Sequence, residues 1–182
     1  KVMCEQVLEE ERSPGFTTVT IRPSTVCGYA PRLRLDLTVN ILTNHAVNNG
    51  KITVFGGDQM RPNIHINDMV DLYLHLLSLP AEKIDGGIYN AGYENLAVIK
   101  IAELVKDTLS MDTEIEVTPT DDNRSYHVSS ELMKRELGFI PKYTVEDAVR
   151  DLQSAFSQGL IPQSMDKSIY FNIRRMQEVD LT

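Results

Sequence analysis

Two arginines, Arg61 and Arg124, are the residues of this sequence best suited to bind an anion. A planar guanidinium group donates bidentate, charge-assisted hydrogen bonds. Because the formal net charge of the chain is −8, an anionic ligand must be held by a few focused arginines against an unfavourable overall field. Arg61 precedes the apolar pattern of residues 64–66 and Arg124 lies in a polar loop, so we expect both at the rim of one pocket. The alternative for either arginine is a surface salt bridge, which contributes little stability.

Small polar residues that follow a predicted strand form a second candidate site. Residues 17–21 are a β-branched run that is typical of a buried strand. Pro23 lacks an N–H and ends the strand, which leaves Ser24, Thr25 and Gly28 near its carboxyl end. In open α/β sheets, ligands bind at that end. The alternative is a core strand followed by an ordinary loop.

Composition limits the classes of protein that this chain can represent. Its 182 residues, 42% of them apolar, suit one globular domain with a real core. We expect no membrane segment, no secretion signal and no nucleic-acid partner, because long apolar runs and basic clusters are missing. Cys4 and Cys27 have no partner at metal-ligand spacing, so we also expect no metal site. A reducing, cytoplasmic environment is the resulting expectation.

Apolar periodicity predicts strands that alternate with helices, the pattern of an α/β fold with mostly parallel strand pairs. The predicted strands cover residues 17–21, 51–55, 60–66, 87–91 and 114–118. The predicted helices cover residues 1–12, 35–49, 67–79, 98–109, 130–137 and 144–157. We expect Asn67 to cap the third helix and Thr144 with Asp147 to open the last one. His65, between two isoleucines, is expected to be a hydrogen-bonded structural residue.

The two ends of the sequence show incomplete patterns. The first residues are already helical in pattern, so we expect this helix to begin upstream of residue 1 and the sequence to be part of a longer protein. Residues 160–182 carry a weak apolar pattern, which predicts a surface-packed tail. The sequence has no glycine-rich strand-to-helix turn of the dinucleotide-binding type. From its residues alone, the chain is interpreted as the second half of an α/β protein, with residues 1–182 forming one domain.

Four segments, in order along the chain, carry a resemblance to a known family. They are Lys1-Val-Met-Cys-Glu-Gln-Val-Leu8, Arg22-Pro-Ser-Thr-Val-Cys-Gly28, Gly56-Gly-Asp-Gln-Met-Arg61-Pro-Asn-Ile-His65-Ile-Asn-Asp68, and Asn123-Arg124-Ser-Tyr126 followed by Leu132-Met-Lys-Arg-Glu-Leu-Gly138-Phe-Ile-Pro141. Together they resemble the carboxyl-terminal half of the extended short-chain dehydrogenase/reductase family, specifically its NAD-dependent nucleotide-sugar epimerases, dehydratases and reductases. The resemblance runs from residue 1 to about residue 157. The family's glycine-rich cofactor loop, acidic ribose-binding residue and catalytic tyrosine would lie upstream of residue 1.

The resemblance implies a binding site for NAD or NADP. Lys1 would be the lysine of the family's Tyr-x-x-x-Lys motif, with a catalytic role: its ammonium group would hydrogen-bond the nicotinamide ribose and lower the pKa of the upstream tyrosine. Pro23 and Ser24 would present backbone groups to the nicotinamide carboxamide. The alternatives are a solvated lysine and ordinary loop geometry.

The resemblance also implies a nucleotide-diphosphate sugar as the substrate. Arg61 and Arg124 would bind its diphosphate. Thr25 stands where the family often has an asparagine that contacts the phosphate or the sugar. Arg32 lies at the start of the family's variable substrate loop, before the helix that contains Asn40, and both are candidate substrate-binding residues. A solvated loop is the alternative.

Three functions remain open from the sequence. The first is an NAD(P)-dependent nucleotide-sugar epimerase, dehydratase or reductase that transfers hydride at sugar C4, with this chain as its substrate-binding half. Its expected fold is the second half of a Rossmann-type parallel sheet with a smaller carboxyl-terminal α/β substrate-binding region, and the family implies a homodimer through the first helix. The second is a non-catalytic nucleotide-sugar-binding or dimerisation module without the cofactor site. The third, a relative acting on steroids or flavonoids, is disfavoured because an apolar ligand has no use for two cations.

Overall fold

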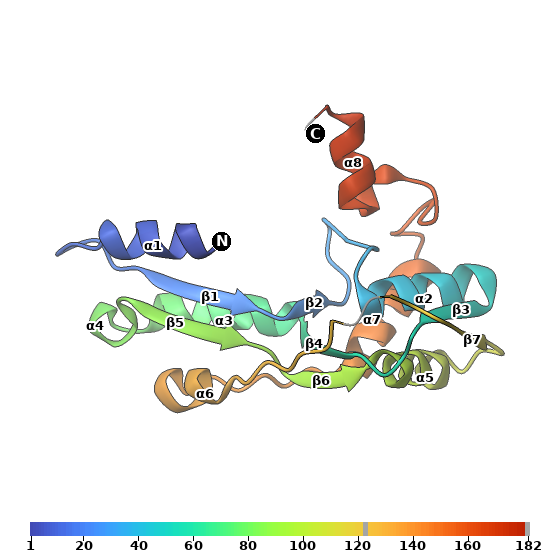
Figure 1. Ribbon diagram of the computed structural model, residues 1–182, viewed down its shortest axis with the longest axis horizontal. Helices are drawn as coiled ribbons and strands as arrows, with labels where there is room; N and C mark the ends of the chain where they lie inside the picture. Colours follow the sequence, from blue (N-terminus) through green and yellow to red (C-terminus); the bar gives the residue numbers. More distant parts are fainter. Residues whose placement is uncertain (122–123, 181–182) are drawn as a thin grey trace.

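The computed structural model describes residues 1–121 and 124–180. Within them, strands form three small sheets that follow one another along the long axis of the molecule (Figure 1). The strands are β1 (Val19–Pro23), β2 (Thr25–Cys27), β3 (Lys51–Phe55), β4 (Met60–His65), β5 (Gly87–Ala91), β6 (Glu94–Ala97) and β7 (Glu114–Thr118). The pairs β1–β5, β2–β4 and β3–β7 are parallel, and β4–β6 is antiparallel. The chain therefore has the predicted α/β fold with mostly parallel strands.

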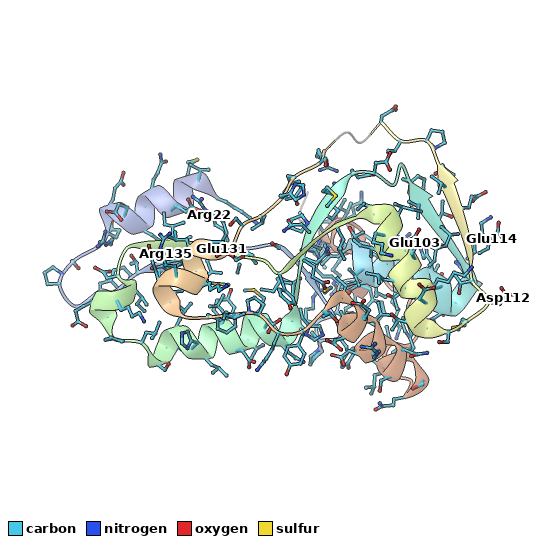
Figure 2. The ribbon with its side chains drawn as sticks, turned by 90° about the horizontal axis from the view of Figure 1, so that it is seen from below. Arg22, Glu103, Asp112, Glu114, Glu131 and Arg135 are labelled. Carbon is cyan, nitrogen blue, oxygen red and sulfur yellow. The ribbon has the colours of Figure 1, made fainter. Side chains whose placement is uncertain are left out.

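The first sheet, β1 with β5, has helices on both faces. The helices around it are α1 (Val2–Glu10), α3 (Ile66–Ser78), α4 (Ala81–Ile84) and α6 (Glu131–Leu137). Apolar side chains of α3, α4 and α6 pack with β1 and β5 in one core cluster. On the other face, the ion pair between Arg22 and Glu5, with N–O distance 2.6 Å, ties α1 to β1. Figure 2 shows Arg22 beside α1, at the same end of the molecule as Glu131 and Arg135 of α6.

The third sheet, β3 with β7, lies at the opposite end and is covered by α2 (Thr38–Asn49), α5 (Val98–Leu109) and α7 (Val145–Ser157). The three helices pack on one another and bury the largest core cluster. Residues 98, 101, 105 and 109 of α5 are all buried, which is the apolar stripe that its spacing predicted. Each large aliphatic side chain that is fully buried here contributes roughly 1.5–3 kcal/mol of stability. This end of the molecule anchors the middle sheet.

The C-terminal segment covers the loop between β2 and α2. It contains the 3-10 helix η1 (Ser168–Tyr170) and α8 (Asn172–Glu178), which stands above that loop in Figure 1. Ile161 and Tyr170 are buried together with Leu33 and Leu35 of the loop and Leu152 of α7. The prediction of a surface-packed tail was therefore wrong for this part. Its few apolar residues are spaced irregularly, so periodicity gave no sign of their burial.

Most predicted elements are confirmed, and the differences have local causes. The strands at residues 51–55, 87–91 and 114–118 and the helix at residues 98–109 have the predicted bounds. The short elements β2, β6 and α4 were missed, because three or four residues carry no readable period. The cap of α3 is His65, whose side chain accepts a hydrogen bond from the Asn67 N–H, so the prediction of Asn67 as the cap was wrong. The predicted capping box of Thr144 and Asp147 is present.

Candidate functional site

Two adjoining cavities lie in the middle of the molecule, after the carboxyl end of β1. The larger has a volume of about 570 Å³ and the smaller about 150 Å³. Thr25, Leu37 and Tyr126 line both, so they form one continuous site. The larger cavity is also lined by five other residues predicted from the sequence: Lys1, Pro23, Ser24, Arg32 and Asn40. The smaller is lined by the two remaining candidates, Arg61 and Arg124. The structure thus brings all eight predicted site residues to one place.

The chain changes its partner strand at Ser24, since β1 before it pairs with β5 and β2 after it pairs with β4. From the sequence we expected the Ser24 backbone to contact the nicotinamide. Its N–H instead donates to the Ala91 carbonyl oxygen at 2.7 Å and is not available to a ligand. The Ser24 Oγ is buried and has no hydrogen-bond partner among the described residues. It lies against Gly92, where an added Cβ would come within 2.4 Å of it. The hydroxyl of Ser24 is thus a buried polar group without a hydrogen-bond partner at the edge of the larger cavity.

A hydrogen bond from the Arg61 side chain to the backbone of Arg124 holds these two residues together. The Arg61 Nη1 donates to the Met60 carbonyl oxygen at 3.0 Å and to the carbonyl oxygen of Arg124. The Met60 N–H in turn donates to the Ser125 Oγ at 3.0 Å. These contacts fasten the segment that follows residue 123, itself outside the described residues, along the start of β4. Two arginines 63 positions apart in sequence therefore line the same small cavity.

Asn40 shapes the loop that walls the larger cavity. It is only 2% exposed. Its Oδ1 accepts from the Gly28 N–H at 3.1 Å and its Nδ2 donates to the Arg34 carbonyl oxygen at 2.9 Å. Gly28 itself has φ of 101°, and an added Cβ would lie 3.0 Å from His65 Nε2, so glycine is required here. Asn40 lines the cavity, but both ends of its amide are used to hold the loop.

The charged residues of the loop differ in their hydrogen-bond partners: Arg34 pairs with a carboxylate, whereas Arg32 contacts neutral oxygens. Arg34 Nε forms an ion pair with Asp36 Oδ1 at 3.0 Å. Burial opposes ionisation of Asp36, but the Arg34 and Asn172 hydrogen bonds outweigh it and lower the pKa of that carboxyl. Arg32 donates to the Leu33 carbonyl oxygen at 3.2 Å and to Asn172 Oδ1 at 2.9 Å. Within the described part of the chain, no carboxylate forms an ion pair with Arg32, so neutral oxygens alone hold its charge.

Sequence reasoning did not separate Tyr126 and Asp36 from ordinary loop residues. Tyr126 lines both cavities, and Asp36 lines the smaller one. The position of Tyr126 two residues after Arg124, in a segment without a helix, was the signal that could have placed them on one side. The proximity of Asp36 depends on the fold of the loop, which no spacing in the sequence indicates.

Other reactive side chains add no chemistry to the site. Burial raises the pKa of Cys27 to about 12, which keeps its thiol protonated. Within residues 1–121 and 124–180, no three His, Cys, Asp or Glu side chains are grouped to hold a metal ion. No helix in those ranges is long and apolar enough to cross a membrane.

Solved structures of three other proteins share this fold. RMD from Pseudomonas aeruginosa, complexed with NADPH, shares 18% identity over 87% of this chain and 55% of its own, with a TM-score of 0.72. UDP-glucose 4-epimerase from Thermotoga maritima, with UDP-glucose, shares 23% identity over 88% of this chain and 52% of its own, with a TM-score of 0.74. The dTDP-glucose 4,6-dehydratase from Bacillus anthracis, in complex with NAD, shares 20% identity over 91% of this chain and 52% of its own, with a TM-score of 0.72. The chain thus spans about half the length of these structures and has their fold.

The sequence profile of the NAD dependent epimerase/dehydratase family matches residues 1–92. The matched region contains α1, the first sheet and the loop that lines the larger cavity. The chain belongs to this family, and the match includes the first three of the four sequence segments that carry the resemblance; the fourth, residues 123–141, lies beyond it.

Proposed function

We propose that this chain is the substrate-binding half of an NAD(P)-dependent nucleotide-sugar epimerase, dehydratase or reductase that transfers hydride at sugar C4. The observation that carries the proposal is the convergence of eight candidate residues, spread over more than 120 positions, on two adjoining cavities. Family membership supports the same reaction class.

We also propose a homodimer through α1, where Met3 is 76% and Val7 54% exposed. A monomer in sedimentation experiments would contradict the dimer.

The larger cavity offers groups for the nicotinamide end of the cofactor. Lys1, Pro23 and Ser24 line it together, and the buried, unpartnered Ser24 Oγ suits a carboxamide partner. These residues fit the group, and Lys1 would hold the nicotinamide ribose through its ammonium. When bound, the cofactor supplies the hydride acceptor or donor for the sugar carbon. The groups that would hold the rest of the dinucleotide are proposed to lie upstream of Lys1.

The smaller cavity suits the diphosphate of the substrate. Arg61 and Arg124 provide two guanidinium groups, and Thr25 provides a hydroxyl where the cavities meet. Charge-assisted hydrogen bonds to phosphate are stronger in a partly desolvated cleft than at the surface. A diphosphate held here would place the attached sugar in the larger cavity, in front of Lys1 and Ser24. Binding at one end thereby orients the reacting carbon at the other.

Removal of either arginine is expected to weaken nucleotide binding. In the protein as its gene encodes it, Arg61→Ala and Arg124→Ala should each raise the Kd for UDP, dTDP, GDP or ADP about 10- to 100-fold, since a hydrogen bond to a charged group contributes about 1.5–3 kcal/mol. Isothermal titration calorimetry measures this. Arg135→Ala is the matched control, because that arginine pairs with Glu136 on the exposed surface of α6.

The results separate the candidate functions. Unchanged affinity in both variants would remove the diphosphate site and the proposal with it. Binding of a nucleotide sugar without conversion of the sugar, in the presence of NAD or NADP, would instead favour the non-catalytic module. Arg61→Lys keeps the charge but not the bidentate geometry, so partial recovery with this variant would support direct phosphate contact.

A further inference from the structure

The C-terminal segment is attached to the loop that walls the larger cavity at three polar contacts. The Leu35 N–H donates to the Tyr170 carbonyl oxygen at 2.8 Å. The Asn172 N–H donates to Asp36 Oδ2 at 3.1 Å, and Arg32 Nη2 donates to Asn172 Oδ1 at 2.9 Å. Residues 136 and 140 positions apart in sequence are thus joined at one asparagine. The conformation of the loop depends on this attachment.

Apolar burial secures one part of the segment and not the other. Tyr170 is 9% exposed and its hydroxyl donates to the Pro162 carbonyl oxygen at 3.3 Å. In contrast, α8 has no buried residues. Its first residue, Asn172, therefore contacts the loop through hydrogen bonds, without a core behind the helix. Contacts of this kind lie at the low-stability end of a fold and can be removed without global unfolding.

Asn172 contacts two charged residues of the loop, Asp36 and Arg32, that line the two cavities. Asp36 lines the smaller cavity beside Arg61 and Arg124, where an uncompensated carboxylate would repel a diphosphate. Both Asp36 oxygens are occupied: Arg34 donates to each of them, through Nε and Nη2, and the Asn172 N–H also donates to Oδ2. Arg32, in contrast, is held by neutral oxygens, so its positive charge is left for the anionic ligand that spans the two adjoining cavities. Asn172 thus helps to restrain the Asp36 carboxylate and orients the Arg32 guanidinium group.

On the basis of the proposed function, we propose that Asn172 is a positioning residue, through which the C-terminal segment orients Arg32 toward the anionic substrate. The role belongs to its side-chain Oδ1, which is the atom that accepts from Arg32. Residues of α8 that do not contact the loop have no such role. Gln177, an exposed amide on the same short helix, provides the matched comparison.

A double-mutant cycle in the protein as its gene encodes it tests this. Asn172→Ala is expected to weaken binding of UDP-glucose, or of whichever of UDP, dTDP, GDP and ADP binds, about three- to tenfold, with Tm unchanged. In an Arg32→Ala background the same substitution should have no further effect, because its target is gone. Gln177→Ala should bind like the wild type. Asn172→Asp keeps the acceptor but cancels the charge of Arg32, so it should keep its Tm and still bind more weakly.

The outcomes distinguish this inference from the function on which it rests. If the wild type binds none of the four nucleotides, the proposed function and the inference fail together. If Arg61→Ala weakens binding but Asn172→Ala does not, only the role of Asn172 is overturned. An Asn172→Ala effect of equal size in the Arg32→Ala background would also overturn it, because the effect would not act through Arg32.

Discussion

At the scale of single residues, His65 shows how one buried side chain fixes the geometry beneath the site. It is 2% exposed, and its Nδ1 accepts the Asn67 N–H at 3.1 Å. In the neutral ring the proton is therefore on Nε2, which faces Asp151 Oδ2 at 3.3 Å. Its Nε2 also limits the space at Gly28, the first residue of the loop between β2 and α2. The prediction of a hydrogen-bonded structural histidine is confirmed.

The ionisation of His65 should make stability depend on pH. Burial lowers the pKa of His65, against the carboxylates of Asp151, Asp68 and Asp147, which raise it. Between the unfolded pKa of about 6.5 and the lower folded value, the unfolded chain binds more protons, so stability is lost as the pH falls through this range. His65→Asn keeps a capping acceptor and removes the titration. Urea unfolding at about pH 7.5 and about pH 5.5 should show a smaller loss of stability in this variant, and equal losses would contradict the assignment.

At the scale of elements, long patterns were predictable and short ones were not. The stripe of α5 and the capping box of α7 appear in the sequence as spacings of three and four residues. The position of β2 depends on its pairing with β4, whose partner residues lie 38 positions away, so no local signal marks it. The same holds for the site: Ser24 and Arg61 follow from strand ends and motifs, whereas the contact of Asn172 with Arg32 is purely tertiary. Residues brought in by the C-terminal segment could not be predicted.

Helix α3 offers a comparison between a buried and an exposed carboxylate that bind the same segment. Asp68 is fully buried and accepts the N–H groups of Lys142 and Tyr143 at 3.0–3.2 Å, while Asp71 forms a surface ion pair with the Lys142 ammonium at 3.0 Å. Asp68→Ala leaves two partly buried N–H donors unpaired and should cost about 2–4 kcal/mol of unfolding free energy. Asp71→Ala should cost about 1 kcal/mol or less. Chemical denaturation measures both, and equal costs would show that the buried carboxylate is not the joint between α3 and the start of α7.

At the scale of the whole molecule, one edge of β1 is unpaired among the described residues. In the described ranges, β1 pairs with β5 on one side only. A cavity of about 460 Å³ runs along its other side between α1 and α3, lined mainly by apolar residues: Leu8, Val19, Thr20, Ile21, Tyr73, Leu76 and Leu77. An unpaired edge between two helices is where a parallel sheet gains its next strand. Because the chain spans about half of the solved structures with its fold, we propose that upstream residues continue the sheet there.

The exposed side of α3 gives this proposal a test. Leu77 is 84% exposed in the described chain. If upstream residues cover it, Leu77→Lys should destabilise the protein as its gene encodes it by about 2 kcal/mol or more, since an apolar side chain is lost and a charge is buried. In residues 1–182 produced alone, the same substitution should leave the unfolding free energy within about 0.5 kcal/mol and should reduce binding of an apolar dye. Residues 1–182 that remain monodisperse and bind no apolar dye would contradict the proposed continuation, as would an equal effect of Leu77→Lys in both proteins.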